Sequence, residues 1–516
     1  MDKKKRTIVH LLGFYLLSLA NIGYAQQDSL SRHNFSVELQ SGYINNKGVP
    51  LWMRSNQYGS IPLSGASVSV LGRAFKDYRT VEWQGKSTPN SPVVDWGYAI
   101  EGRVNAGRKF QGQLIEAHVK MRVAMFEARV GRSKDVMGLN GDTVLTSGNF
   151  SVSGNALGVP KFEISIPSYY RLPWLGGLLS FKGNFATGYM GKMDMNPSAF
   201  RVPTSDYAVE TFLHQKSLYG RLGKPSWRLQ LYGGFNHQAQ WGGEKKRYGE
   251  DYKLNFFQTL THVTLGQAYG GKGNPIPRSK VGNHQGSIDL GASYNFGPVS
   301  LMLYRQSFYD VGAISKLANI ADGLNGITMK NNRYQPKSPK NWDWEKLLFE
   351  FFYSKDQAGY PWSKPTSSGD EDYYNNSEYM EGWSYLGTGM GSPLIPTAAS
   401  VRPGQAHYPK DYFISNRVVA GHIGASGRLY QWHVLTKITL ARHFGTFATS
   451  EFGKSTGSHF HRPYVDRFEP VHQFSFFLRT ERAIDQKTSV GGSFATDQGK
   501  LLYSGSGVLI HLRRTF

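Results

Sequence analysis

The side chains that could carry out chemistry fit no common catalytic pattern. The chain of 516 residues contains no cysteine, which excludes thiol catalysis, disulfide scaffolds and cysteine-ligated zinc. It contains no His-Glu-x-x-His, Walker or Gly-x-Ser-x-Gly motif, so metalloprotease, phosphate-loop and serine hydrolase mechanisms lack support. We therefore predict a protein that is not an enzyme and that needs no cofactor.

Three smaller groups could bind a metal ion or a phosphate. His443, His459 and His461 could hold a metal, but spare histidines in a polar loop are the favoured interpretation. Asp370–Asp372 could bind calcium, and a solvated acidic loop tip is favoured over it. Gly387–Gly391 is rich in glycine but lacks the strand–helix context of a phosphate-binding loop. We predict no metal site.

The N-terminal segment predicts export from the cytoplasm. Lys3–Arg6 is basic, Ile8–Ala20 is apolar, and Gly23 and Ala25 place small residues before a cleavage site. This order is typical of a secretory signal peptide, expected here over residues 1–25. The formal charge of +22 then points to acidic partners outside the cell, such as lipid head groups, lipopolysaccharide or acidic polysaccharide, and not to nucleic acid.

The remaining sequence reads as β-strands with one apolar and one polar face. In Leu114–Val123, Ile115 and Val119 lie on the apolar face, and Glu116 and Lys120 lie on the polar face. A soluble sandwich and a transmembrane barrel both show this alternation, with opposite faces turned inward. Charges on the second face of so many strands favour a barrel with a wet lumen. The pattern recurs around Leu229–Phe235, Ile288–Phe296, Trp432–Leu440, Phe474–Leu478 and Val508–Leu512.

These features together predict an all-β fold: a transmembrane antiparallel β-barrel of the bacterial outer membrane. Mean hydropathy is −0.43, too low for a bundle of transmembrane helices. At roughly 27 residues per strand with its loop, the single domain over residues 26–516 would hold about 18 strands, within a range of 16–20. The only helical candidate is about two turns near Ile314–Ala321. The terminal Phe516 is similar to the signal that outer-membrane barrels present to the barrel-assembly machinery.

The number of strands between two loops determines whether the loops lie at the same end of the barrel. Strands expected at Val299–Phe308, Leu324–Asn331 and Glu345–Tyr353 put the loops 309–323 and 354–413 on the same side. Long loops of such barrels are usually extracellular.

The loop 354–413 combines aromatic faces with amide and charged groups, which is what a carbohydrate-binding surface needs. The alternative is that its aromatic side chains pack the loop onto the barrel mouth. The candidate carbohydrate-binding residues are Tyr373, Tyr374, Asn375, Trp383, Tyr385 and Arg402.

Several segments resemble a known family. Leu145–Lys161 resembles the signature of the capsule-assembly Wzi family, and so do Tyr304–Gln306 and Asp322–Leu324. Three further segments resemble the form seen in Bacteroidetes members: Tyr373–Asn376, Glu381–Tyr385 and Gly391–Leu394. Trp52–Gly59, near the start of the chain, is another match to the family.

The resemblance implies an outer-membrane barrel of about 18 strands with a plugged lumen. It implies a lectin-like, non-catalytic role in assembling or attaching capsular or other surface polysaccharide. Ser153, Asn155, Arg305 and Asp322 occupy motif positions, where they would either bind glycan or brace the lumen. Two alternatives stay open: a porin or channel for oligosaccharides, and an outer-membrane hydrolase with its site at the barrel mouth.

Overall fold

The structure is a computed structural model that describes residues 33–45, 47–78, 93–310, 312–336, 341–361, 363, 369–456, 459–460 and 466–516. The predicted signal peptide (1–25) and His461 lie outside the described residues.

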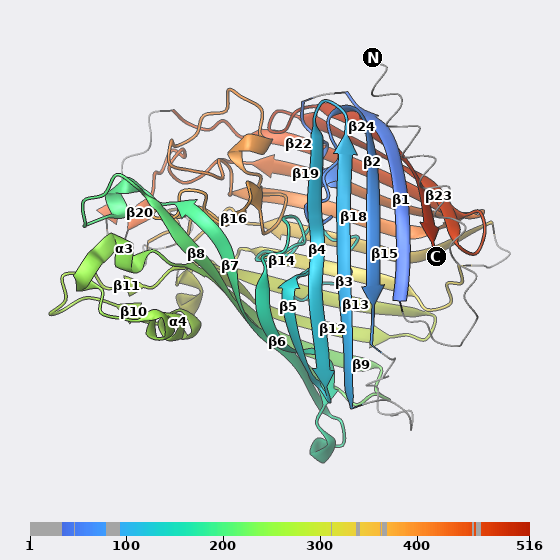
Figure 1. Ribbon diagram of the computed structural model, residues 1–516, viewed down its shortest axis with the longest axis horizontal. Coiled ribbons are helices and arrows are strands. Elements are labelled where there is room, and N and C mark those ends of the chain that lie inside the picture. The colour runs from blue at the N-terminus through green and yellow to red at the C-terminus, as the bar shows by residue number, and fades with distance from the viewer. Residues whose placement is uncertain are drawn as a thin grey trace.

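Eighteen antiparallel strands form one closed sheet, as predicted (Figure 1). Each strand pairs with its neighbours in the chain, and the first strand pairs with the last, with Ser36 opposite Thr515. Closure leaves no unpaired strand edge within this sheet. The strands are β1 (His33–Ile44), β2 (Gly65–Lys76), β3 (Val94–Ala106), β4 (Phe110–Val123), β5 (Phe126–Arg132), β6 (Lys161–Arg171), β7 (Leu179–Asp194), β8 (Ala208–Leu222), β9 (Leu229–Trp241), β12 (Asn283–Asn295), β13 (Val299–Tyr309), β14 (Gly323–Asn331), β15 (Trp342–Tyr353), β18 (Val418–Leu429), β19 (Trp432–His443), β22 (Val471–Ala483), β23 (Thr488–Gly499) and β24 (Gly505–Thr515).

The exposure of the strand residues shows which side chains point outward and which point into the barrel. On β4, Val119 and Met121 are exposed on the outside, whereas Glu116 and Arg122 are buried on the inside. Apolar side chains outside and polar side chains inside are the arrangement of a transmembrane barrel and the reverse of a soluble sandwich. Further exposed members of this apolar outer face are Leu229, Leu231, Ile288, Leu290, Leu440, Val508, Ile510 and Leu512.

One residue of the predicted apolar face is misplaced. Ile115 is fully buried, because the pairing of β3 with β4 shifts between Glu101 and Gly102. These residues face Glu116 and Leu114, so Ile115 is the extra residue of a β-bulge. Leu114 takes the outward position instead.

The prediction that no helix exceeds about two turns was wrong. The connection from β9 to β12 contains α4 (Phe256–Leu265), which begins with a capping box between Asn255 and Gln258 and ends at Gly266 in the left-handed conformation. Near Ile314–Ala321 the chain forms only the 3-10 turn η5 (Ala313–Lys316). No helix among the described residues is long and apolar enough to cross a membrane. The other short elements are α2 (Leu51–Arg54), η2 (Pro173–Leu175), η3 (Pro197–Ala199), α3 (Glu244–Tyr248), η4 (Gly249–Asp251), β10 (Ala268–Tyr269), β11 (Ser279–Lys280), β16 (Ser384–Tyr385), β17 (Thr388–Gly389), η6 (Ala398–Ser400), β20 (Ser455–Thr456) and β21 (His459–Phe460).

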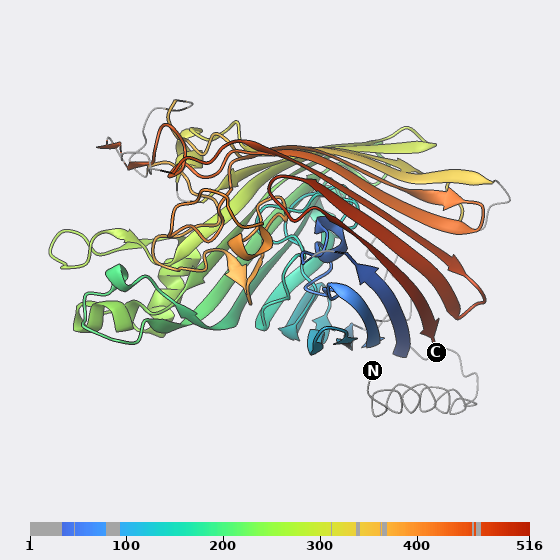
Figure 2. The ribbon, with the colours of Figure 1, turned by 90° about the horizontal axis from the view of Figure 1, so that it is seen from above.

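The two ends of the barrel differ. One end, which we call the long-loop end, carries the connections 133–160, 242–282, 310–322 and 354–417, and Figure 1 shows α3, α4, β10 and β11 grouped there. The other, the short-turn end, holds tight turns such as 430–431, together with the start of β1 and the end of β24 (Figure 2). The predicted loops 309–323 and 354–413 correspond to two long-loop connections on the same side, as parity required.

Candidate functional site

Three segments from the long-loop end enter the barrel. The described residues of 45–64, 133–160 and 354–417, which we call the inner segments, contribute buried apolar side chains to one large cluster. Inward-facing strand residues such as Phe308 and Phe352 belong to the same cluster. Figure 2 shows segments from both halves of the chain within the ring of strands. The barrel interior therefore holds a packed core of its own.

Glu350 is a central anchor of segment 133–160. This β15 carboxylate is fully buried and accepts hydrogen bonds from Thr146 Oγ1 (2.7 Å), Ser147 N (2.6 Å) and Ser147 Oγ (2.6 Å). The hydroxyl of Tyr304 on β13 donates to it as well. Four donors on one carboxylate offset much of the cost of burying its charge.

Other inward-facing side chains hold the same segment. Leu139 N donates to Asp289 on β12 at 2.8 Å, and Gln306 on β13 donates to the Leu139 carbonyl at 2.8 Å. His422 on β18 lies 2.7 Å, through Nε2, from the Leu145 carbonyl. Segment 133–160 is thus tied to four strands, β12, β13, β15 and β18.

The predicted carbohydrate-binding residues of the long loop lie inside this core. Tyr373 and Trp383 have 0% of their surface exposed, and Tyr374 has 1%. The hydroxyl of Tyr374 donates to the Phe150 carbonyl, and Trp383 Nε1 donates to the Ser151 carbonyl at 2.8 Å. Stacking against a sugar requires an exposed ring face. The structure therefore corrects the expectation of an exposed aromatic platform at these rings, which join segment 354–417 to segment 133–160.

The other three candidates also make structural contacts. Asn375 is buried and exchanges two hydrogen bonds with the Phe413 backbone, at 2.9 and 3.0 Å. Tyr385 is buried, and its hydroxyl accepts a bond from Arg132 at 3.3 Å. Arg402 is only partly buried, and its Nε donates to the Lys500 carbonyl at 2.9 Å. Arg402 thereby fastens the loop to the connection between β23 and β24.

The four motif residues brace the inner segments. Ser153 Oγ donates to the Gly391 carbonyl at 2.7 Å, and Asn155 Nδ2 donates to the Gly389 carbonyl at 3.0 Å. Arg305 donates to the carbonyl of Asp322 at 3.1 Å.

Asp322 also receives hydrogen bonds through its carboxylate. It accepts from the Tyr373 hydroxyl at 2.7 Å and from the backbone of Asp356 and Gln357 at 2.9 and 2.7 Å. Burial raises the pKa of Asp322 to about 7, although these hydrogen bonds act in the opposite direction.

The acidic tip considered for calcium is used for loop contacts. Asp370 accepts a bond from Ser455 N at 2.6 Å, and Asp372 pairs with Lys454. Asp411 lies 3.9 Å from Lys454, and its pKa is raised to about 7 by burial and by the charge of Asp372. No group of three or more metal-binding side chains is placed to hold an ion within the described part of the chain.

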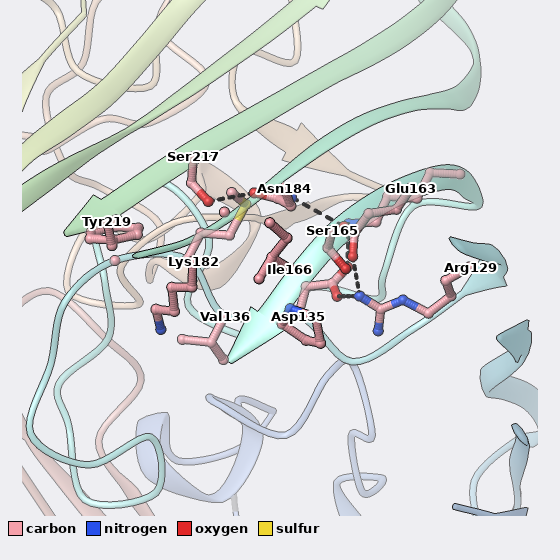
Figure 3. A pocket seen from close by; sticks show the side chains of 15 residues that line it. Arg129, Asp135, Val136, Glu163, Ser165, Ile166, Lys182, Asn184, Ser217 and Tyr219 are labelled. Atoms are coloured by element: carbon pink, nitrogen blue, oxygen red, sulfur yellow. Dashed lines mark hydrogen bonds and ion pairs between the residues drawn. The ribbon is translucent and has the colours of Figure 1, made fainter. Parts of the chain in front are cut away.

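A polar cavity of about 190 Å³ lies between segment 133–160 and the inward faces of β5 to β8 (Figure 3). Arg129 contacts Glu163 and lies 3.6 Å from Asp135, and Lys161 lies 2.5 Å from Asp135 and 3.3 Å from Glu163. Burial alone would raise the pKa of Asp135, but Lys161 and Arg129 outweigh it and lower the pKa. Lys182 also lines this cavity.

Sequence reasoning did not single out these cavity residues. The charged residues among them lie on β5 (Arg129), β6 (Lys161 and Glu163), β7 (Lys182) and segment 133–160 (Asp135). Nothing local separates them from the polar faces of the other strands.

The comparisons with known proteins agree on the fold. A family model described as "Capsule assembly protein Wzi" matches residues 26–408. The structure of Wzi from Escherichia coli, an outer-membrane protein described as a carbohydrate-binding β-barrel involved in group 1 capsule assembly, matches with a TM-score of 0.50 at 10% identity. The match covers 93% of this chain and 84% of that one.

Two other solved barrels are more distant. Acinetobacter baumannii OccAB4 has a TM-score of 0.44 at 8% identity, covering 95% of this chain and 100% of its own. Pseudomonas aeruginosa OccK2 (OpdF), solved in complex with glucuronate, has a TM-score of 0.42 at 9% identity, covering 95% and 99%. A search of curated proteins finds no match.

The family model spans well over half of the chain and includes the motif segments that brace the lumen. It confirms the resemblance noted from those motifs, and the apolar outer face and closed sheet agree with it. This chain belongs to the Wzi capsule-assembly family and is an 18-stranded β-barrel of the bacterial outer membrane.

Proposed function

We propose that this protein binds capsular or other surface polysaccharide at the outer membrane and helps to assemble or attach the capsule. Family membership is the observation that carries the proposal. The E. coli protein of the same name as the family is described as carbohydrate-binding, and a lectin-like role is the corresponding activity here. The long-loop end would then face the outside of the cell.

The inner segments would close the lumen to free passage. Their contacts reach strands on several sides of the barrel, as in Glu350 with Ser147, Asp289 with Leu139, and Trp52 Nε1, which donates to Thr439 on β19 at 2.9 Å. A channel needs a continuous wet path, which a packed aromatic core opposes. These contacts favour the polysaccharide-binding function over the porin alternative.

We propose no catalytic role. Among the described residues, two interior acids that could act as a general acid or base are already engaged, Asp322 with Tyr373 and Asp135 with Lys161. We also propose that the protein contacts lipid and lipopolysaccharide along its apolar outer face. Phe516 is half exposed beside Phe35, with ring centroids 5.3 Å apart, so the barrel-assembly machinery could reach it.

Gene deletion and complementation test the proposal. We expect the deletion strain to retain less capsule on cells and to shed more into the medium, and the full-length gene to restore retention. Unchanged retention would overturn the attachment role. Purified protein in planar bilayers should show no steady conductance, and a steady open channel would favour the porin alternative.

A further inference from the structure

A cationic and aromatic patch lies on the inner wall between the polar cavity and the short-turn end. Lys182 on β7 places Nζ 5.2 Å from the ring centroid of Tyr169 and 5.6 Å from that of Tyr219. Arg221 on β8 places its guanidinium carbon 4.9 Å from the Tyr169 ring. Two cations thus lie within cation–π distance of one tyrosine ring.

These cations differ from their neighbours in having no acidic partner. Arg129 and Lys161 are paired with Asp135 and Glu163 in the same cavity. For Lys182 and Arg221, the described residues supply no carboxylate oxygen within 4.0 Å. Charges inside a barrel are usually paired unless water or a ligand reaches them.

The guanidinium of Arg221 is only partly satisfied. Its Nη2 donates to Ser180 Oγ at 3.3 Å, and its buried Nε has no hydrogen-bond partner. Asp289 is an acid close to Tyr219. Its carboxylate already accepts hydrogen bonds from the Tyr219 hydroxyl (3.0 Å) and from Leu139 N. A guanidinium group with an unused N–H donor is suited to binding a carboxylate.

Aromatic and hydroxyl groups complete the patch. Tyr232 on β9 packs edge-on against Tyr169, with centroids 5.8 Å apart, and its hydroxyl lies 3.2 Å from Ser293 Oγ. Both rings are half-buried, so part of their surface is accessible. Partly exposed tyrosines beside cations offer a sugar ring a flat apolar face and its acid group a charge.

The patch lies near the short-turn end. Arg221 is one residue from the end of β8 at Leu222, and Lys182 is three residues from the start of β7 at Leu179. Val136 and Gly138, which line the cavity, belong to segment 133–160, which enters from the long-loop end. In outer-membrane barrels the short turns face the periplasm.

We infer that Tyr169, Lys182 and Arg221 form a subsite for an acidic oligosaccharide that enters from the periplasmic side. The carboxylate of a uronic acid unit lies between Lys182 and Arg221, and the sugar ring packs on Tyr169. The inference rests on the proposed polysaccharide-binding function and specifies its substrate class and one point of contact.

Binding by the full-length protein in detergent micelles tests the subsite. The acidic probe is a hyaluronan tetrasaccharide, which carries two glucuronates, and the neutral probe is chitotetraose, each followed by calorimetry. We expect wild type to bind the acidic probe about tenfold more tightly than the neutral one, and K182Q/R221Q to lose that preference. Equal affinities of wild type for both probes, or no binding of the acidic probe, would overturn the subsite.

A matched double variant controls for charge alone. K330Q/R333Q removes one lysine and one arginine at the same end of the barrel, from β14 and the turn after it. We expect K330Q/R333Q to bind the acidic probe as wild type does. Equal losses in both double variants would mean non-specific attraction and would overturn the subsite while leaving the proposed function standing. Failure of the capsule-retention experiment would instead remove the proposed function on which the subsite rests.

Cysteine labelling tests the direction of access. Because the chain has no cysteine, Lys182→Cys places a single thiol in the patch. We expect a membrane-impermeant maleimide to label it only after the outer membrane is permeabilised, whereas Leu386→Cys, exposed on segment 354–417, is labelled on intact cells. Labelling of Lys182→Cys on intact cells at the rate of Leu386→Cys would overturn entry from the periplasm.

Discussion

The two halves of the barrel interior are built from opposite kinds of side chain. Toward the long-loop end, Phe150 stacks on Phe308 with ring centroids 4.2 Å apart, and Tyr373 packs edge-on against both rings. Toward the short-turn end, the wall carries ion pairs such as Arg513 with Glu38 at 2.9 Å. One half is packed with aromatic rings and the other carries charges, so the first suits a plug and the second a ligand.

Residue type alone therefore does not indicate where the binding surface lies. The tyrosines and tryptophan that look most like a sugar platform stabilise the core, because their rings are enclosed on all sides. The tyrosines beside Lys182 keep part of their surface accessible.

Replacing Trp383 by Ala should cause the largest loss of stability. The change removes a fully buried ring and the hydrogen bond to the Ser151 carbonyl, so we expect unfolding to become easier by about 3–5 kcal/mol. The measurement is urea unfolding in micelles. Leu386→Ala, at an exposed position of the same segment, should change stability by about 0.5 kcal/mol or less. A Trp383→Ala variant as stable as wild type would show that this half is not a packed core.

Replacing Glu350 by Gln should loosen segment 133–160. The amide loses the charge that four donors surround and turns an NH₂ group toward two of them, at a cost of about 2–3 kcal/mol. We expect faster trypsin cleavage after Lys134 and occasional conductance in planar bilayers. Glu345→Gln, on the same strand at a half-exposed position, is the control. Unchanged protease resistance would mean that Glu350 is not the anchor.

Raising the pH should weaken the contact between segment 354–417 and residues 444–456. The folded pKa of Asp411, about 7, lies above its ordinary value near 4, so the folded chain keeps a proton that the unfolded chain releases. The stabilisation is complete below about pH 4 and is lost as pH rises to about 7, by about 1–2 kcal/mol. The hydroxyl of Thr446 donates to Asp411 at 2.6 Å. Hydrogen exchange of the Thr446 amide, corrected for intrinsic rates, should show the loss. Asp411→Asn should abolish this pH dependence, and an unaltered profile would contradict the assignment.

Replacing Arg402 by Ala should have the smallest effect. Its bonds to the backbone of β23 and the following connection are partly exposed, so we expect a loss of about 0.5–1 kcal/mol and normal capsule retention. Cells that shed capsule while the variant protein stays folded would give Arg402 a direct role in glycan binding. They would also move the binding surface to the long-loop end.

A feature of the fold could be predicted from the sequence when it depends on residues that are near one another in the chain. Strand alternation is local, so the polar and apolar faces and the number of strands were predictable. The bulge at Ile115 was not, because it depends on pairing with Glu101 and Gly102. The capping box at Asn255 and Gln258 was a local signal for α4 that the strand-rich surroundings obscured.

Alternation along the strands and the motif segments were enough to indicate an all-β barrel with apolar residues outside and to suggest its family. Two features depend on the folded chain: segment 354–417 turns inward and buries Tyr373 and Trp383, and Tyr169 on β6 meets Arg221 on β8 across β7. The physical reason is that burial and charge pairing depend on contacts between residues far apart in the chain. Trp383 with Ser151 and Ser147 with Glu350 are such contacts, and no local pattern specifies them.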